Sequence, residues 1–232
     1  MSDTMIRPGT WIRYHGDLIQ GSDEWLEARC GLLTASEMKL IVTPTLKPAS
    51  NDKERSHLYE LLAQRVTGYV EPCYISSDML RGQEDEIEAR AMYAKHHDPV
   101  QEVGFITNSQ WGFTIGYSPD GMIGDDGLIE CKSRRQKFQV ETIVSHKMPD
   151  EYMIQVQTGL LVTKRKWLDF VSYSGGLPMV VIRVLPDPAV QDAIVAAATA
   201  FEVRLAEKLA EYRKRSPTMI QTERRVEQEM YI

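Results

Sequence analysis

The pattern of apolar and polar positions predicts helices over much of the chain. Residues 52–67 show the clearest amphipathic pattern, with Leu58, Leu61, Leu62 and Val66 on one face and Gly68 as a stop signal. Further helices are expected at residues 22–30, 78–96, about 135–146, 150–163 and from Pro188 to about Arg215. Thr34 to Glu37, with a capping oxygen and an early acid, resemble one more helix start. In the segment 78–96, the side chains expected to face inward are Leu80, Ile87, Ala91 and Ala94.

Between these helices the periodicity changes to that of β-strands. The expected strands are Val100–Thr107, Gly112–Tyr117, Leu128–Lys132, Lys166–Ser174 and Met179–Leu185. Helices on both sides of such strands make the fold class α/β or α+β, with a central mixed β-sheet flanked by helices. The chain contains no repeat and no obvious linker, so we expect a single domain over residues 1–232.

Composition and charge narrow the picture only slightly. The chain is 43% hydrophobic and carries a formal charge of −6, which does not suggest a nucleic-acid binder but does not exclude one either. The three cysteines, Cys30, Cys73 and Cys131, form no C-x-x-C pair, so free thiols in a reducing cytoplasm are expected. The longest nearly apolar run, Ala193 to Phe201, is too short to cross a bilayer, and the N-terminus lacks the apolar core of a signal peptide.

Candidate chemistry lies in the stretch Ser118 to Arg134. Glu130 and Lys132 are two apart in a predicted strand and therefore project to the same face. A hairpin would bring Asp120, which follows Pro119, beside Glu130. Two carboxylates and the backbone carbonyl of Cys131 would form an oxygen-only site suited to Mg²⁺, with Lys132 next to the ion. An exposed turn acid and a surface Glu–Lys pair explain the spacing equally well.

Three more polar residues bear on the choice between these two interpretations. Glu86 lies on the helix before the first predicted strand, where acids usually form a solvated face. Gln155 and Gln157 lie among apolar residues of a later helix. An amide there is either a hydrogen-bonded core group, which is the commoner outcome, or a group that faces a cleft.

The motifs S-P-D-G (Ser118 to Gly121) and L-I-E-C-K (Leu128 to Lys132) resemble the core of the P-D…(D/E)-x-K nucleases. Within that group the chain is similar to the bacteriophage lambda exonuclease family. Three further segments occur in the family's order: W-L-E-A-R-C-G-L-L-T-A-S-E (Trp25 to Glu37), the helix G-Q-E-D-E-I-E-A-R (Gly82 to Arg90) and Y-M-I-Q-V-Q (Tyr152 to Gln157). The resemblance implies a restriction-endonuclease-like catalytic core at about residues 22–185, followed by a C-terminal helix and tail.

The resemblance also implies roles for individual residues. Asp120 and Glu130 match the family's metal ligands together with the carbonyl of Cys131, Lys132 matches the catalytic lysine, and Glu86 matches a supporting acid. Gln155 matches a glutamine near the attacking water or scissile phosphate, with Gln157 as a second candidate. Arg29 and Ser36 match a pocket for the 5′-terminal phosphate, although a surface arginine and a helix cap are the ordinary interpretations.

One position departs from the family. The lambda member has an additional acid in the strand before S-P-D-G, and Gln110 lies near that place here, which puts a carboxylate ligand in doubt. Basic residues expected on a DNA-contacting wall are Lys47, Lys53, Arg55, Arg134, Arg135 and Lys137, although a solvated surface charge is the usual interpretation of each.

The activity implied by the resemblance is a Mg²⁺-dependent 5′→3′ exonuclease on double-stranded DNA ends, with two ions per active site and Mn²⁺ as an alternative metal. It would release mononucleotides and leave 3′ single-stranded DNA for recombination by strand annealing. The implied partners are two further copies in a homotrimeric ring and a single-strand annealing protein, in the cytoplasm of a bacterial host of a phage or prophage. The alternatives are a restriction- or repair-type endonuclease and a non-catalytic module that binds DNA ends.

Overall fold

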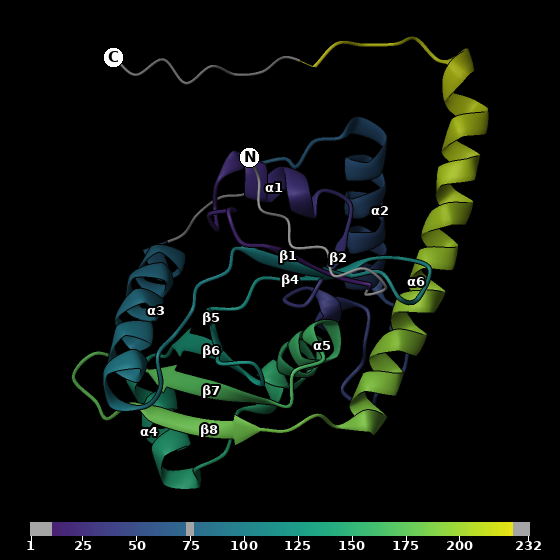
Figure 1. Ribbon diagram of the computed structural model, residues 1–232. Helices are drawn as coiled ribbons and strands as arrows, with labels where there is room; N and C mark the ends of the chain where they lie inside the picture. Colours follow the sequence, from purple (N-terminus) through teal and green to yellow (C-terminus); the bar gives the residue numbers. More distant parts are fainter. Residues whose placement is uncertain (1–10, 73–76, 225–232) are drawn as a thin grey trace, which may run out of the picture.

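The computed structural model describes residues 11–72 and 77–224 (Figure 1). Its strands form two four-stranded sheets instead of the single central sheet that we expected. The first sheet has the order β1-β3-β4-β2 and comprises β1 (Ile12–His15), β2 (Leu33–Thr34), β3 (Phe105–Asn108) and β4 (Ile115–Tyr117). The second has the order β5-β6-β7-β8 and comprises β5 (Gly121–Ile123), β6 (Gly127–Ser133), β7 (Trp167–Tyr173) and β8 (Val180–Val184).

Both sheets are mixed, as predicted, and helices flank them. β2 runs parallel to β4 and β6 runs parallel to β7, whereas the other strand pairs are antiparallel. The α-helices are α1 (Asp23–Arg29), α2 (Asp52–Thr67), α3 (Ser77–His96), α4 (Gln136–Ser145), α5 (Met153–Thr163) and α6 (Pro188–Arg215). Short 3₁₀ turns are η1 (Met38–Leu40), η2 (Asp150–Tyr152) and η3 (Ser216–Thr218). No helix within the described ranges is long and apolar enough to span a membrane.

The long periodic helices lie where the sequence predicts them. α2 occupies the predicted range, with Asn51 as its N-cap and Gly68 in the left-handed conformation at its end. α6 begins after the cap Asp187 and runs along one side of the molecule beside α2 and α5 (Figure 1). The helix start expected at Thr34 to Glu37 is wrong, because Ala35 N donates to Gly116 O and continues the pairing of β2 with β4.

The inward face that we expected for α3 is also wrong. Leu80 and Ile87 are more than half exposed, whereas Ala89 and Tyr93 are fully buried. The small Ala89 allows close packing on β6 and β7, and the hydroxyl of Tyr93 donates to Asp169 Oδ2 at 2.7 Å. The structure therefore buries Tyr93, whose hydroxyl has a hydrogen-bond partner, and leaves the aliphatic side chains of Leu80 and Ile87 exposed to solvent.

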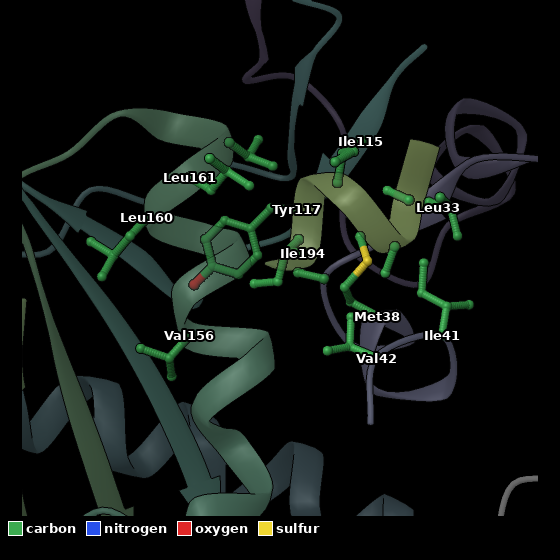
Figure 2. Close-up of a cluster of buried hydrophobic side chains, with 14 of the residues drawn as sticks. Leu33, Met38, Ile41, Val42, Ile115, Tyr117, Val156, Leu160, Leu161 and Ile194 are labelled. Carbon is green, nitrogen blue, oxygen red and sulfur yellow. The ribbon is translucent and has the colours of Figure 1, made fainter. Parts of the chain in front are cut away.

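α5 lies between the two sheets and joins them in one core (Figures 1 and 2). Figure 2 shows Val156, Leu160 and Leu161 of this helix around Tyr117, the last residue of β4. Alternate residues of β6 point to opposite faces of the second sheet. One face is turned towards α5, and α3 covers the other. The polar residues of β6 on the α5 face thus lie close to the boundary between the sheets.

Candidate active site

The S-P-D-G turn connects the two sheets at this boundary. β4 ends at Tyr117 and β5 begins at Gly121, so Asp120 lies in the crossing between them. β5 pairs antiparallel with β6, with Gly121 opposite Ile129. This hairpin brings Asp120 next to β6, as expected, and Asp120 Oδ2 accepts a 2.6 Å hydrogen bond from the backbone nitrogen of Cys131.

Glu130 and Lys132 lie side by side on β6. Lys132 Nζ is 2.8 Å from Glu130 Oε1 and 3.9 Å from Glu86 Oε1 on α3. Glu130 is only 2% exposed, so the interpretation of a surface Glu–Lys pair is wrong. A buried carboxylate needs charged or polar partners, and those of Glu130 come from three separate elements.

Two of these partners hold the two oxygens of the Glu130 carboxylate. Gln155, at the start of α5, donates its side-chain amide to Oε1. Tyr117, which is 1% exposed, donates its hydroxyl to Oε2 at 2.7 Å. Sequence reasoning missed Tyr117, and the only signal in the sequence is a tyrosine inside an apolar strand, where its hydroxyl requires a partner.

The electrostatics of the cluster reflect an excess of negative charge. Burial raises the pKa of Asp120 to about 8, and the neighbouring Glu130 adds to the shift. Burial also raises the pKa of Glu86 above its ordinary value. For Lys132, burial lowers the pKa, but the surrounding carboxylates of Glu130, Asp120 and Glu86 outweigh it and raise the pKa above its ordinary value.

This donor set fits a hard divalent cation. Asp120 and Glu130 offer carboxylate oxygens, and the backbone nitrogen of Cys131 donates to Asp120. Because the N–H and C=O of a strand residue point to roughly the same side, we expect the carbonyl of Cys131 on the side of β6 where Asp120 lies. Oxygen-only ligands of this kind suit Mg²⁺. Among the described residues no three acidic, imidazole or thiol groups converge as a ready metal site, and the Lys132 ammonium lies between Glu86 and Glu130.

A cavity of about 180 Å³ opens beside these groups. It brings together most of the residues singled out from the sequence: Arg29, Ser36, Glu86, Asp120, Glu130, Lys132 and Gln155. Asp120, Glu130 and Lys132 come from the junction of the two sheets, Glu86 from α3 and Gln155 from α5. Arg29 ends α1, and Ser36 lies in the turn after β2.

Arg29 and Ser36 form a second polar group within the same cavity. The guanidinium carbon of Arg29 lies 4.1 Å from the ring centre of Trp25, and Nη2 donates to Thr34 Oγ1 at 3.4 Å. Burial lowers the pKa of Arg29, and Glu37 partly compensates. Ser36 lies 3.4 Å from Thr34 Oγ1 and caps no helix. A half-buried guanidinium beside a hydroxyl is suited to bind a phosphate group.

Two predicted DNA-contacting side chains lie elsewhere. Gln157 is 1% exposed and belongs to the core, where it donates to Leu185 O and accepts from Asp187 N, both at 2.8 Å. Arg134 is 8% exposed and donates to Glu151 at 2.6 Å and to the Tyr152 hydroxyl at 2.8 Å. Both predictions are therefore corrected, because hydrogen bonds within the protein occupy these side chains.

Three other predicted positions are also located. With its amide oxygen turned towards them, Gln110 accepts from Lys164 Nζ and Trp111 Nε1, each at 3.0 Å. Lys164 follows the C-terminal end of α5, whereas Gln155 at the N-terminal end reaches Glu130, so Gln110 does not substitute for a metal-site acid. Lys47 and Arg135 are exposed.

Residues that sequence reasoning did not select hold the S-P-D-G turn. Gln20 Nε2 donates to Pro119 O at 2.9 Å, and Trp25 Nε1 donates to Ser118 Oγ at 2.9 Å. Arg90 on α3 donates to Asp120 O at 3.3 Å. These contacts join segments 30 to 99 residues apart, so local sequence patterns carry no signal for them.

Solved structures of known proteins share this fold. The chain is similar to an alkaline exonuclease (LHK-Exo) from Laribacter hongkongensis, with 34% identity, a TM-score of 0.75 and coverage of 84% of this chain and 98% of that one. A second structure of LHK-Exo, in complex with dAMP, matches with 34% identity and a TM-score of 0.75 over 85% of this chain and all of that one. A phage-related exonuclease from Haemophilus somnus shares the fold at 15% identity and a TM-score of 0.52, covering 77% of this chain and 96% of that one.

No curated protein sequence matches significantly. The sequence pattern of the YqaJ-like viral recombinase domain matches residues 24–166, a range that contains all seven predicted residues that line the cavity. That match covers more than half of the chain, and the expected kinship with phage-type recombination exonucleases is confirmed. The chain belongs to the YqaJ-like viral recombinase domain family and has the fold of a nuclease that acts on DNA in recombination.

Proposed function

We propose that the protein is a metal-dependent 5′→3′ exonuclease that degrades linear double-stranded DNA from its ends. It releases mononucleotides and leaves 3′ single-stranded DNA. The observation that carries this proposal is the shared cavity, which Arg29 and Ser36 line together with Asp120, Glu130 and Lys132. Arg29 and Ser36 are proposed to bind the 5′-terminal phosphate. An enzyme that only cut within a duplex would not need a terminal-phosphate site next to its reactive groups.

In this proposal Asp120, Glu130 and the Cys131 carbonyl hold Mg²⁺, and Glu86 supports the site. Two ions per site are proposed, with Mn²⁺ as an alternative. When bound, such ions neutralise charge on the scissile phosphate and favour a hydroxide nucleophile. Lys132 Nζ lies among these carboxylates and positions the attacking water or offsets phosphate charge, while Gln155 keeps Glu130 in place.

The 5′→3′ direction of degradation in this proposal depends on the second polar group, Arg29 and Ser36. A 5′-terminal phosphate bound by Arg29 and Ser36 leaves the first phosphodiester bond of that strand to reach the carboxylates. Hydrolysis there releases a deoxynucleoside 5′-monophosphate, and the next phosphate becomes the new terminus. The LHK-Exo relative has been crystallised with dAMP, which is a product of this class.

Assembly and partners are proposed from the same kinship. We expect three copies to form a ring around the duplex, with exposed cations such as Lys47 and Arg135 towards DNA. A single-strand annealing protein would act on the 3′ strand in the cytoplasm of a bacterial host. Equilibrium sedimentation of the free protein tests the trimer, since a monomer at all concentrations would contradict it.

The direct test uses linear duplex labelled at the 5′ or at the 3′ end, with Mg²⁺ or with EDTA. We expect early release of the 5′ label as a mononucleotide, only in the presence of Mg²⁺. Early release of the 3′ label would contradict the polarity, and release in EDTA would contradict the metal dependence.

A covalently closed plasmid separates this activity from that of an endonuclease on the same core. We expect the closed circle to persist while the linearised plasmid disappears. Closed circles cut as fast as linear DNA would establish the endonuclease instead.

A further inference from the structure

The hydroxyl of Tyr117 forms a direct hydrogen bond with Glu130, a candidate metal ligand. It donates to Glu130 Oε2 at 2.7 Å, while Gln155 and Lys132 bond the other carboxylate oxygen. An ionised carboxylate offers about four lone-pair sites. Three protein donors therefore fix the plane and rotation of the Glu130 carboxylate and leave limited directions for an ion.

The Tyr117 ring packs against α5 at Gly159, where the helix surface carries no side chain. A Cβ at Gly159 would lie 2.7 Å from Tyr117 Cζ, so any larger residue there would displace the ring. Gly159 lies four residues after Gln155 and hence on the same helical face. One face of α5 thus supplies the amide for Oε1 and the space through which the tyrosine reaches Oε2.

The position of Tyr117 in the chain allows its side chain to connect the two sheets. It is the final residue of β4, three residues before Asp120, and its backbone belongs to the first sheet. Glu130 belongs to the second sheet. The hydroxyl bond therefore ties the two sheets together where the two carboxylates must keep a fixed separation.

We propose that Tyr117 is a positioning residue that orients the carboxylate of Glu130 for divalent-metal binding. The inference rests on the proposed metal-dependent nuclease and names a further residue for it. Outer partners of metal ligands fix ligand orientation, and their loss typically lowers metal affinity or activity by about 10- to 100-fold. Tyr117 itself touches neither metal nor substrate in this role.

The chain contains a matched control for the competing explanation that Tyr117 only stabilises the fold. Tyr93 is fully buried, and its hydroxyl also donates at 2.7 Å to a buried carboxylate, that of Asp169. Tyr93 does not line the cavity. Tyr93→Phe and Tyr117→Phe thus remove the same atom from similar surroundings, and only the second touches the candidate metal site.

The test measures Mn²⁺ binding to wild type, Tyr117→Phe and Tyr93→Phe without DNA, by the electron paramagnetic resonance signal of the free ion. Urea unfolding of the metal-free proteins measures stability in parallel. We expect Tyr117→Phe to bind Mn²⁺ about 10-fold more weakly. Tyr93→Phe should keep wild-type affinity, although both variants lose stability.

A second readout is the Mg²⁺ dependence of DNA degradation. Tyr117→Phe should require a higher Mg²⁺ concentration for half-maximal rate and should recover much of its rate at high Mg²⁺. A Tyr117→Phe variant with wild-type Mn²⁺ affinity would overturn the inference, as would an equal loss of affinity in both variants. Wild-type protein that neither binds Mn²⁺ nor degrades DNA would instead reject the proposed function.

Gly159→Ala provides an independent variant if Tyr117→Phe folds poorly. Its added Cβ should push the Tyr117 ring from Glu130 and weaken Mn²⁺ binding in the same direction. Gly82→Ala, on α3, adds a methyl group into open space and serves as its control. Unchanged Mn²⁺ affinity in Gly159→Ala, with the ring displaced in its crystal structure, would also overturn the inference.

Discussion

Lys132 Nζ lies 2.8 Å from Glu130 Oε1, and the two residues project from the same face of β6. Among the described residues that line the cavity, Lys132 carries the only ammonium group and lies with three carboxylates. Its positive charge offsets part of the cost of burying Glu130. The same group is therefore a partner of the metal-free site and a candidate catalyst.

Replacement of Lys132 tests the catalytic assignment. Lys132→Ala should lower the rate of DNA degradation by roughly 10²- to 10⁴-fold, the usual contribution of a positioned proton-transfer group. Circular dichroism should show a retained fold. Lys166→Ala is the matched control, because Lys166 forms an exposed ion pair with Asp126 at 2.8 Å outside the cavity. A wild-type rate in Lys132→Ala would remove the residue from the mechanism.

The raised pKa of Asp120 predicts a pH dependence of stability. Its pKa lies at about 8 in the folded protein, above the ordinary value of 3.8. Between these values the folded state binds a proton that the unfolded state has released, so the free energy of unfolding should fall as pH rises. Urea titrations in EDTA should show this decline in wild type and a weaker one in Asp120→Asn. Parallel pH profiles for the two proteins would contradict the shift.

Arg29 should decide the preference for phosphorylated ends. Charge-assisted hydrogen bonds to phosphate contribute about 1.5–3 kcal/mol, so Arg29→Ala should reduce the preference for 5′-phosphate over 5′-hydroxyl duplexes by roughly 10- to 100-fold. Initial rates on the two substrates provide the measurement. Arg55→Ala, at an exposed i,i+3 pair with Asp52, should leave the preference unchanged. An unaltered ratio in Arg29→Ala would reject the pocket.

Arg134 and Lys47 should behave differently when replaced. Arg134 is held by Glu151 and Tyr152, so Arg134→Ala should lower the free energy of unfolding by about 1–3 kcal/mol with little change in DNA affinity. Lys47 is exposed, and Lys47→Ala should weaken DNA binding and reduce its salt dependence while stability is kept. Fluorescence anisotropy at several salt concentrations separates the two, and reversed effects would refute both assignments.

The sequence predicts well those features that depend on long periodic segments or on the order of motifs. α2 and α6 have clear caps and repeated apolar positions, and their observed bounds match the prediction. Strands β1 and β5, with four and three residues, were missed because neither belongs to a longer segment with strand periodicity. β3 and β4 have the same lengths but lie within the longer expected segments Val100–Thr107 and Gly112–Tyr117. The strands divide into two sheets at the S-P-D-G turn. Pairing between strands that are distant in the sequence determines this division.

Side-chain roles were predictable only where chemistry restricts them. Gln155 and Gln157 occupy similar apolar surroundings in the sequence, yet one reaches Glu130 and the other binds the backbone near Asp187. Helix α3 shows the same limit, because the buried Tyr93 depends on Asp169, 76 residues away. Such choices depend on tertiary partners, and local patterns do not contain them.

Gly159 has a consequence for protein engineering. A glycine inside a helix is an obvious target for thermostabilisation, since alanine has a helix propensity better by about 1 kcal/mol. Here the added methyl group would collide with Tyr117, whose hydroxyl bonds Glu130. A redesign guided by helix propensity alone would therefore improve a segment of the scaffold at the expense of the reaction centre, and directed evolution for activity at high temperature should retain this glycine.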